Sequence, residues 1–111
     1  MATKLPNYLR TFRKRAYLTQ DELAFLLGTE SGTRVSRYER FGRSPGLETA
    51  LAYAVIFAAP QRQLFAGIHE RIEKSVRDRA GELVTRLEDG TQTAVTRRKL
   101  ACLRAITSSN N

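Results

Sequence analysis

The 111-residue chain has very few of the side chains on which enzymes and metal proteins depend. Its one cysteine, Cys102, can form neither an intramolecular disulfide nor a site of several thiolates, which fits a reducing compartment. It has one histidine, His69, and no Gly-rich phosphate loop, HExxH or GxSxG sequence. We therefore expect no enzymatic activity, no cofactor and no metal site.

Long hydrophobic runs are also missing. The longest, residues 50–59, has ten residues. A membrane-spanning helix needs roughly 20 apolar residues. The first residues, MATKLPNYLRTF, lack the apolar core of a secretory signal. We expect no membrane contact and a cytoplasmic protein.

Acidic residues are outnumbered by basic ones. Lys and Arg total 19 and Asp and Glu total 11, which gives a formal charge of +8. A basic balance favours polyanionic partners, with nucleic acid first and anionic membrane surfaces second. The length allows one domain of ordinary size and excludes two full ones.

No stretch alternates apolar and polar residues as a strand does, so the chain is predicted to be all-α. Turn residues separate short amphipathic segments, which predict five helices and then a C-terminal extension of about two. The expected helices cover residues 7–16, 20–27, 32–40, 47–58, 61–65, 66–87 and 94–106, and the last five residues are expected to be disordered. Near residue 66 the short segments separated by turns give way to a long, regularly spaced apolar pattern. This change predicts one domain over residues 1–66 and an extension over residues 67–111.

Local signals support these boundaries. Thr19 and Glu22 have the spacing of a capping box at the start of the second helix. Gly28 can adopt the positive φ that ends that helix, and Ser31 is the expected cap of the third. The fourth helix is rich in alanine and aromatic residues, so we expect it to be the most buried.

Arginine occupies every third position from residue 34 to residue 43. On a helix that advances 100° per residue, Val35 and Tyr38 share one side with Glu39, the only acid of this helix. The opposite side carries Thr, Ser and Arg side chains. Such a side is either a solvated charged face or a surface that contacts phosphates and bases. The absence of acids among these arginines favours DNA.

The preceding residues are informative as well. The sequence LTQDELAFLLG, a polar turn and RVSRYERFGRSPGLETALAYAV together resemble the lambda-repressor-like helix-turn-helix family, the XRE/Cro class of phage repressors. The likeness runs from Leu9 to about Phe65. It implies a five-helix domain whose third helix enters the DNA major groove while the second crosses the backbone. One departure is that six residues separate Gly28 from Val35, where the family usually has five.

The resemblance also implies roles for individual positions. Base-edge candidates are Thr33, Arg34 and Arg37, and Ser36 could contact a base or a phosphate. Phosphate candidates are Gln20, Arg40 and Arg43.

Structural roles follow in the same way. Ala24 is small where the second and third helices cross, and Gly28 makes the turn. Arg13 is expected to pair with Glu39, the alternative being that Arg13 joins Lys14 and Arg15 in a basic surface run.

Three positions depart from the family pattern or from an ordinary surface. Gly32 falls where the family commonly has a side chain that contacts a base, so one possible contact with DNA is missing. Phe25 and Leu26 occupy usually charged positions and need a cover, from the C-terminal helices or from a partner.

Apolar residues recur every three or four positions from Ile68 to Leu87. This stripe either packs on its own domain or forms a dimer seam.

The resulting hypothesis is a sequence-specific, repressor-like regulator that binds double-stranded DNA as a homodimer, nucleoid-associated in a bacterial or phage-infected cell. Two alternatives remain: an antitoxin-like DNA-binding protein that neutralises a protein partner through residues 67–111, and a nucleoid-type binder without sequence preference.

Overall fold

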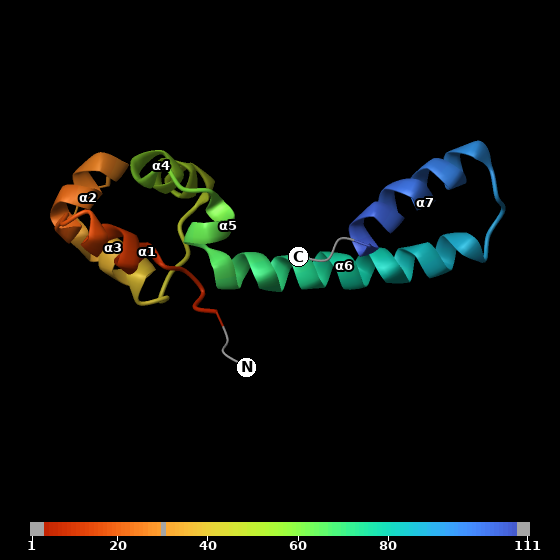
Figure 1. Ribbon diagram of the computed structural model, residues 1–111, viewed down its shortest axis with the longest axis horizontal. Coiled ribbons are helices and arrows are strands. Elements are labelled where there is room, and N and C mark those ends of the chain that lie inside the picture. Colours follow the sequence, from red (N-terminus) through yellow and green to blue (C-terminus); the bar gives the residue numbers. More distant parts are fainter. Residues whose placement is uncertain (1–3, 30, 109–111) are drawn as a thin grey trace. The chain divides into compact units, whose positions relative to one another are not determined.

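The computed structural model describes residues 4–29 and 31–108 (Figure 1). In these residues the chain forms seven α-helices and no strand, which confirms the all-α class and the order of five helices followed by two. The contacts divide the chain into two compact units, residues 1–69 and residues 70–111.

The first unit is built from short helices. They are α1 (Leu9–Arg15), α2 (Gln20–Leu27), α3 (Gly32–Glu39), α4 (Leu47–Phe57) and α5 (Gln61–Leu64), followed by the first residues of α6 (Ala66–Glu88). Each helix end lies within two residues of its predicted position.

The predicted capping signals of the first unit are present. The Glu22 backbone N–H donates to Thr19 Oγ1 over 3.0 Å, and the Thr19 N–H donates to Glu22 Oε1 over 2.9 Å. This capping box satisfies two backbone donors at the start of α2, and it confirms the helix start read from the sequence. At the other end Gly28 has a φ of +78°, the left-handed conformation that glycine adopts without steric cost.

The core of the first unit takes one fully buried side chain from each of its five short helices. These residues are Leu9, Leu23, Val35, Tyr53 and Leu64. Because every short helix contributes to the same cluster, the core fixes α2 and α3 against the other three helices.

The expectation that α4 is the most buried helix is wrong. Tyr53 is its only buried residue, whereas Leu47, Leu51 and Val55 are 73%, 48% and 80% exposed. These three residues recur every four positions and therefore share one face, which points away from the core. A segment that is apolar all round gives no sequence signal of which face is covered. Phe25 and Leu26 of α2 are exposed as well.

The start of α6 is bound to the start of the chain. The Gly67 and Ile68 N–H groups donate to the Leu5 and Pro6 carbonyls over 2.9 and 3.2 Å. These bonds satisfy donors that the first turn of a helix leaves without an intrahelical partner. They also explain why the first unit extends to residue 69, three residues beyond the predicted boundary at residue 66.

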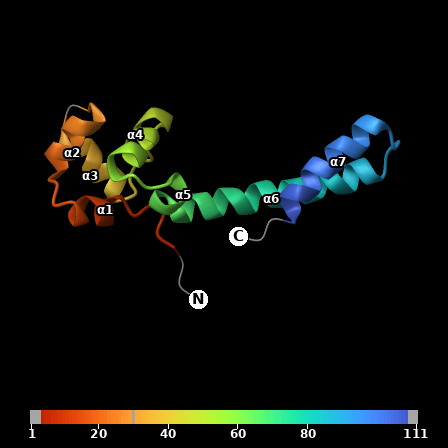
Figure 2. The same ribbon diagram turned by 45° about the horizontal axis from the view of Figure 1, so that its top comes forward.

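The second unit is a helical hairpin, in which α7 (Ala94–Thr107) runs back along α6 (Figures 1 and 2). Ala80 and Leu100 are its buried hydrophobic residues. Three residues of the predicted stripe, Ile72, Val76 and Leu83, are exposed. The stripe is therefore only partly covered within this unit.

The ends of the hairpin differ slightly from expectation. Thr107 belongs to α7 and Ser108 caps it, so these two residues of the predicted disordered tail are ordered, while residues 109–111 lie outside the described part. None of the helices in the described ranges is both long enough and apolar enough to cross a membrane.

Candidate nucleic-acid interface

The start of α3 contacts the start of α2. The Gly32 N–H donates to Asp21 Oδ1 over 2.9 Å, and the Thr33 N–H donates to Ser31 Oγ over 3.3 Å. A Cβ atom on Gly32 would lie 2.6 Å from Asp21 Oδ1 and 3.1 Å from Gln20 Cβ. Residue 32 is therefore part of the helix contact. The sequence showed only that a reading side chain was missing there.

The exposed side of α3 brings the predicted contact residues together. Val35, Tyr38 and Glu39 are buried, as their helical positions predicted. The other side of the helix and its end carry the exposed residues Thr33, Arg34, Arg37 and Arg40 and the half-buried Ser36. Arg43 is exposed in the loop between α3 and α4. This face is rich in cations and hydroxyl groups and contains no acid.

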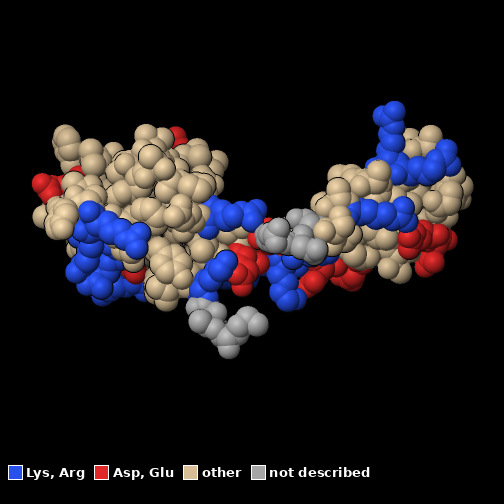
Figure 3. Space-filling model, in the orientation of Figure 1, with Lys and Arg blue, Asp and Glu red and all other residues tan. Residues whose placement is uncertain are grey.

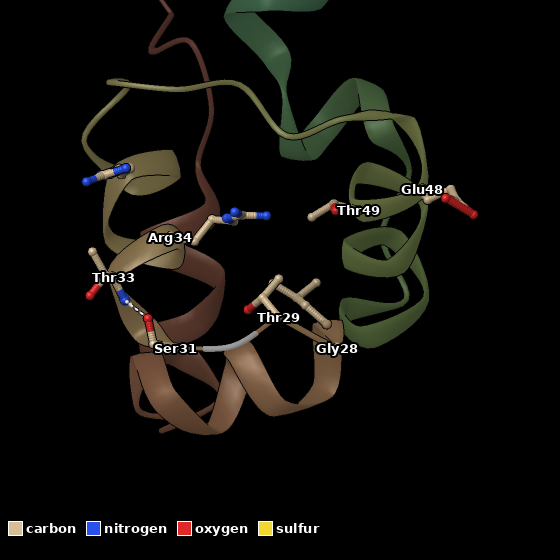
Figure 4. Close-up of a pocket in the computed structure, with 9 residues that line it drawn as sticks. Gly28, Thr29, Ser31, Thr33, Arg34, Glu48 and Thr49 are labelled. Atoms are coloured by element: carbon tan, nitrogen blue, oxygen red, sulfur yellow. Dashed lines mark hydrogen bonds between the residues drawn. The ribbon is translucent and has the colours of Figure 1, made fainter.

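A groove of about 690 Å³ lies between the start of α3 and the start of α4. In Figure 4, Arg34 of α3 and Thr49 of α4 point toward one another, while Glu48 points away on the outer side. Sequence reasoning did not name Glu48 or Thr49 as part of this surface. The sequence gives no local signal for these two positions, because they meet α3 only through the packing of α4, which begins at Leu47.

Gln20 was assigned to a phosphate, but the structure gives its side chain a protein partner. Its Nε2 donates to Glu39 Oε1 over 3.2 Å. A side-chain amide has two hydrogens on that nitrogen, so one remains available to an external acceptor. The phosphate role of Gln20 stays a prediction, now with a partner that orients the amide.

Arg13 and Glu39 form a buried ion pair on the side of α3 opposite its exposed arginines. Arg13 Nε lies 2.6 Å from Glu39 Oε2 and Nη2 lies 3.0 Å from Oε1, and both residues are buried. Arg13 Nη1 also donates to the Leu18 carbonyl. The hydrogen bond to Glu39 raises the pKa of Arg13 above its usual value. The expected pair is therefore present, and the alternative of a surface run is wrong for Arg13.

Ala24 and Tyr53 pack in the same core. Ala24 is buried, which lets α2 and α3 approach. The Tyr53 hydroxyl is buried and has no hydrogen-bond partner in the described part of the chain. Burial, and next the charge of Glu39, raise the pKa of Tyr53 well above 10.0.

Basic side chains gather over part of the face of the first unit that Figure 3 shows. In Figure 3, blue Lys and Arg side chains cover the region where Figure 1 places α1 and α3, while the surface over α4 is mostly tan. Among the described residues, no group of three or more His, Cys, Asp or Glu side chains could hold a metal ion.

Comparison with known proteins agrees with this geometry. Residues 9–59 match the family model described as helix-turn-helix. No curated protein and no solved structure matched the chain. The matched residues contain α2, the turn at Gly28 and the basic helix α3. Over residues 9–59 the chain is therefore similar to the XRE or lambda-repressor-like helix-turn-helix family, as its sequence indicated.

Proposed function

We propose that this protein is a sequence-specific, repressor-like transcription regulator that reads operator DNA with α3. The observation that carries the proposal is the division of this helix into two sides. Val35 and Tyr38 anchor it in the core, while Thr33, Arg34 and Arg37 face outward. A recognition helix needs this arrangement, since its base-reading side chains must reach the major groove from a fixed backbone.

The outward side chains suit base recognition. The guanidinium groups of Arg34 and Arg37 can each bind guanine O6 and N7 with two hydrogen bonds. The Thr33 and Ser36 hydroxyls can donate or accept, so they can bind base edges or phosphates. Arg40 and Arg43, beyond the helix, would bind phosphates and set its register on the duplex. Occupancy of an operator by this domain would block RNA polymerase, although the same residues are equally compatible with activation.

The proposal includes a homodimer, because helix-turn-helix repressors read two-fold sites with two copies of the recognition helix. Ile72, Val76 and Leu83 of α6 supply the supporting observation, since three exposed apolar residues on one helix need a cover. The same residues would suit a protein partner, as an antitoxin-like function requires. We prefer a second copy because the proposed reading of a two-fold operator needs two recognition helices.

Selection of bound duplexes from a random DNA pool tests the proposal. Salt near 150 mM suppresses purely electrostatic binding. We expect enrichment of an inverted repeat whose half-sites are about one helical turn apart. A pool that stays random after repeated rounds would contradict sequence reading and favour a nucleoid-type binder.

Sedimentation of the full chain tests the dimer. Val76→Glu places a charge on the exposed stripe and should shift a dimer toward monomer, whereas Val95→Glu changes an exposed valine of α7 and serves as the matched control. A chain that is monomeric both free and on DNA would contradict the homodimer. A stable complex with a different protein through residues 67–111 would favour the antitoxin-like function.

A further inference from the structure

A second cationic surface lies beside the recognition helix. A hollow of about 580 Å³ opens between α1 and the end of α3. Arg10 and Lys14 of α1 line it from one side, and Arg40 lines it from the other. Arg10 and Lys14 are four residues apart, so they project from the same face of α1.

The charge of this hollow is not balanced by the protein. Arg10, Lys14 and Arg40 are exposed, and none of them forms an ion pair within residues 4–29 and 31–108. The one acid in the lining is Glu39, whose two oxygens already bind Arg13. Three cations therefore face solvent around a hollow whose only carboxylate is neutralised from behind.

Hydrogen-bond donors complete the lining. The Tyr8 hydroxyl accepts from the Leu5 N–H over 3.1 Å, so its own hydrogen is free to donate outward. Thr11 and Ser36 add hydroxyl groups, and Gln20 adds its second amide hydrogen. Cations together with neutral donors are the groups with which proteins bind phosphate oxygens.

We infer that this hollow binds the sugar–phosphate backbone of duplex DNA beside the bases that α3 reads. The inference rests on the proposed function for the placement of α3 on DNA. Continuity of the surface favours duplex DNA over a free anion. Gln20 and Ser36 line both this hollow and a second one at the start of α2 and α3, where Thr33 also lies. A strand that passes the recognition helix would therefore run on into the hollow.

The salt dependence of DNA binding tests this contact. Each neutralised phosphate contributes about 0.9 to the slope of log K against log salt concentration on duplex DNA. The double variant Arg10→Ala/Lys14→Ala should lower that slope by about 1.8 on a random-sequence duplex, measured from about 50 to 200 mM salt. The preference for a selected site over random DNA should not change, because phosphate contacts carry no direct sequence information.

Arg15→Ala is the matched control. Arg15 lies on α1 and is exposed, but it packs over the Phe12 ring and does not line the hollow. Arg15→Ala should change the slope much less than Arg10→Ala or Lys14→Ala does alone. If Arg15→Ala lowers the slope as much as Lys14→Ala does, net charge alone accounts for the effect and the contact is wrong. An unchanged slope in the double variant would also overturn it.

A charge-preserving variant guards against misfolding. Arg10→Lys/Lys14→Arg keeps both cations and should retain the wild-type slope. Loss of slope in this variant would mean that the alanine result came from damage to α1, and would overturn the inference. Because the measurement uses random DNA, a chain that selects no sequence still gives a slope, so failure of the proposed function is distinguished from failure of the contact. A wild-type chain that binds no duplex at low salt overturns both.

Discussion

Arg13 and Glu39 are joined by two parallel hydrogen bonds that tie α1 to the last residue of α3. Gln20 at the start of α2 donates to the same carboxylate, and Arg13 also binds the Leu18 carbonyl in the link between α1 and α2. One largely buried polar cluster thus connects three helices behind the exposed, cationic side of α3. It fixes the direction in which α3 presents its side chains.

Arg13→Ala should destabilise the protein by about 3 kcal/mol, because it leaves the buried Glu39 carboxylate without its cation. Urea unfolding followed by circular dichroism measures the loss. The double variant Arg13→Met/Glu39→Leu should lose less than Arg13→Ala, since no buried charge remains. A double variant at least as unstable as the single one would show that the uncompensated charge is not the cause.

Tyr53→Phe should raise the free energy of unfolding by about 1 kcal/mol, because it removes a buried hydroxyl that has no partner. The effect should also depend on pH. In the unfolded chain the hydroxyl loses its proton near pH 10.0, while burial keeps it protonated in the fold, so the wild type loses stability as the pH rises above 10.0. The Phe variant lacks this contribution, and its advantage should grow in that range. A clear loss of stability in Tyr53→Phe near pH 7 would show that the hydroxyl has a partner.

Gly32→Ala should destabilise the first unit by about 1–2 kcal/mol, because its Cβ has no room against Asp21 and Gln20. Gly81→Ala is the control. A Cβ there meets nothing within 4 Å, and alanine is the better helix former, so this change should stabilise α6 by about 0.5–1 kcal/mol. Chemical denaturation of both variants measures whether each change lowers or raises the free energy of unfolding. Equal effects of both changes would contradict the steric argument.

Arg37→Ala should weaken binding to the selected operator by about 1–3 kcal/mol and to random DNA much less. Arg40→Ala should weaken both by similar amounts, because a phosphate contact is present on every sequence. Titration of labelled duplexes at one salt concentration compares the two variants. Equal losses on both duplexes for Arg37→Ala would exclude base reading by this residue.

The sequence predicted the parts of this fold that depend on local chemistry. Thr19 with Glu22 and the glycine at position 28 define α2 through backbone bonds within a few residues. The burial of Val35 and Tyr38 follows from helical spacing, since one face of α3 is apolar and the other is not. Local spacing could not predict the Arg13–Glu39 pair, because the two residues are far apart in the chain. Only the family resemblance implied it.

Other features depend on distances between elements, which the sequence does not carry. The exposed face of α4 was missed because an apolar residue such as Val55 looks the same whether covered or open. The contact of Gly32 with Asp21 depends on how closely two helices cross. The hollow was missed because Lys14 was interpreted only as part of a basic run with Arg15, and Arg10 was not singled out in the sequence.

The link between the chain's first residues and α6 uses only main-chain atoms on both sides. Side-chain identity at position 5 is therefore free to drift without loss of these bonds, whereas position 67 is not, since a Cβ there would meet the Leu5 carbonyl. Proteins that keep this link should vary at position 5 and hold a glycine at position 67. A mutational scan should therefore find that position 5 tolerates substitution and that position 67 does not, although the two residues share one hydrogen bond.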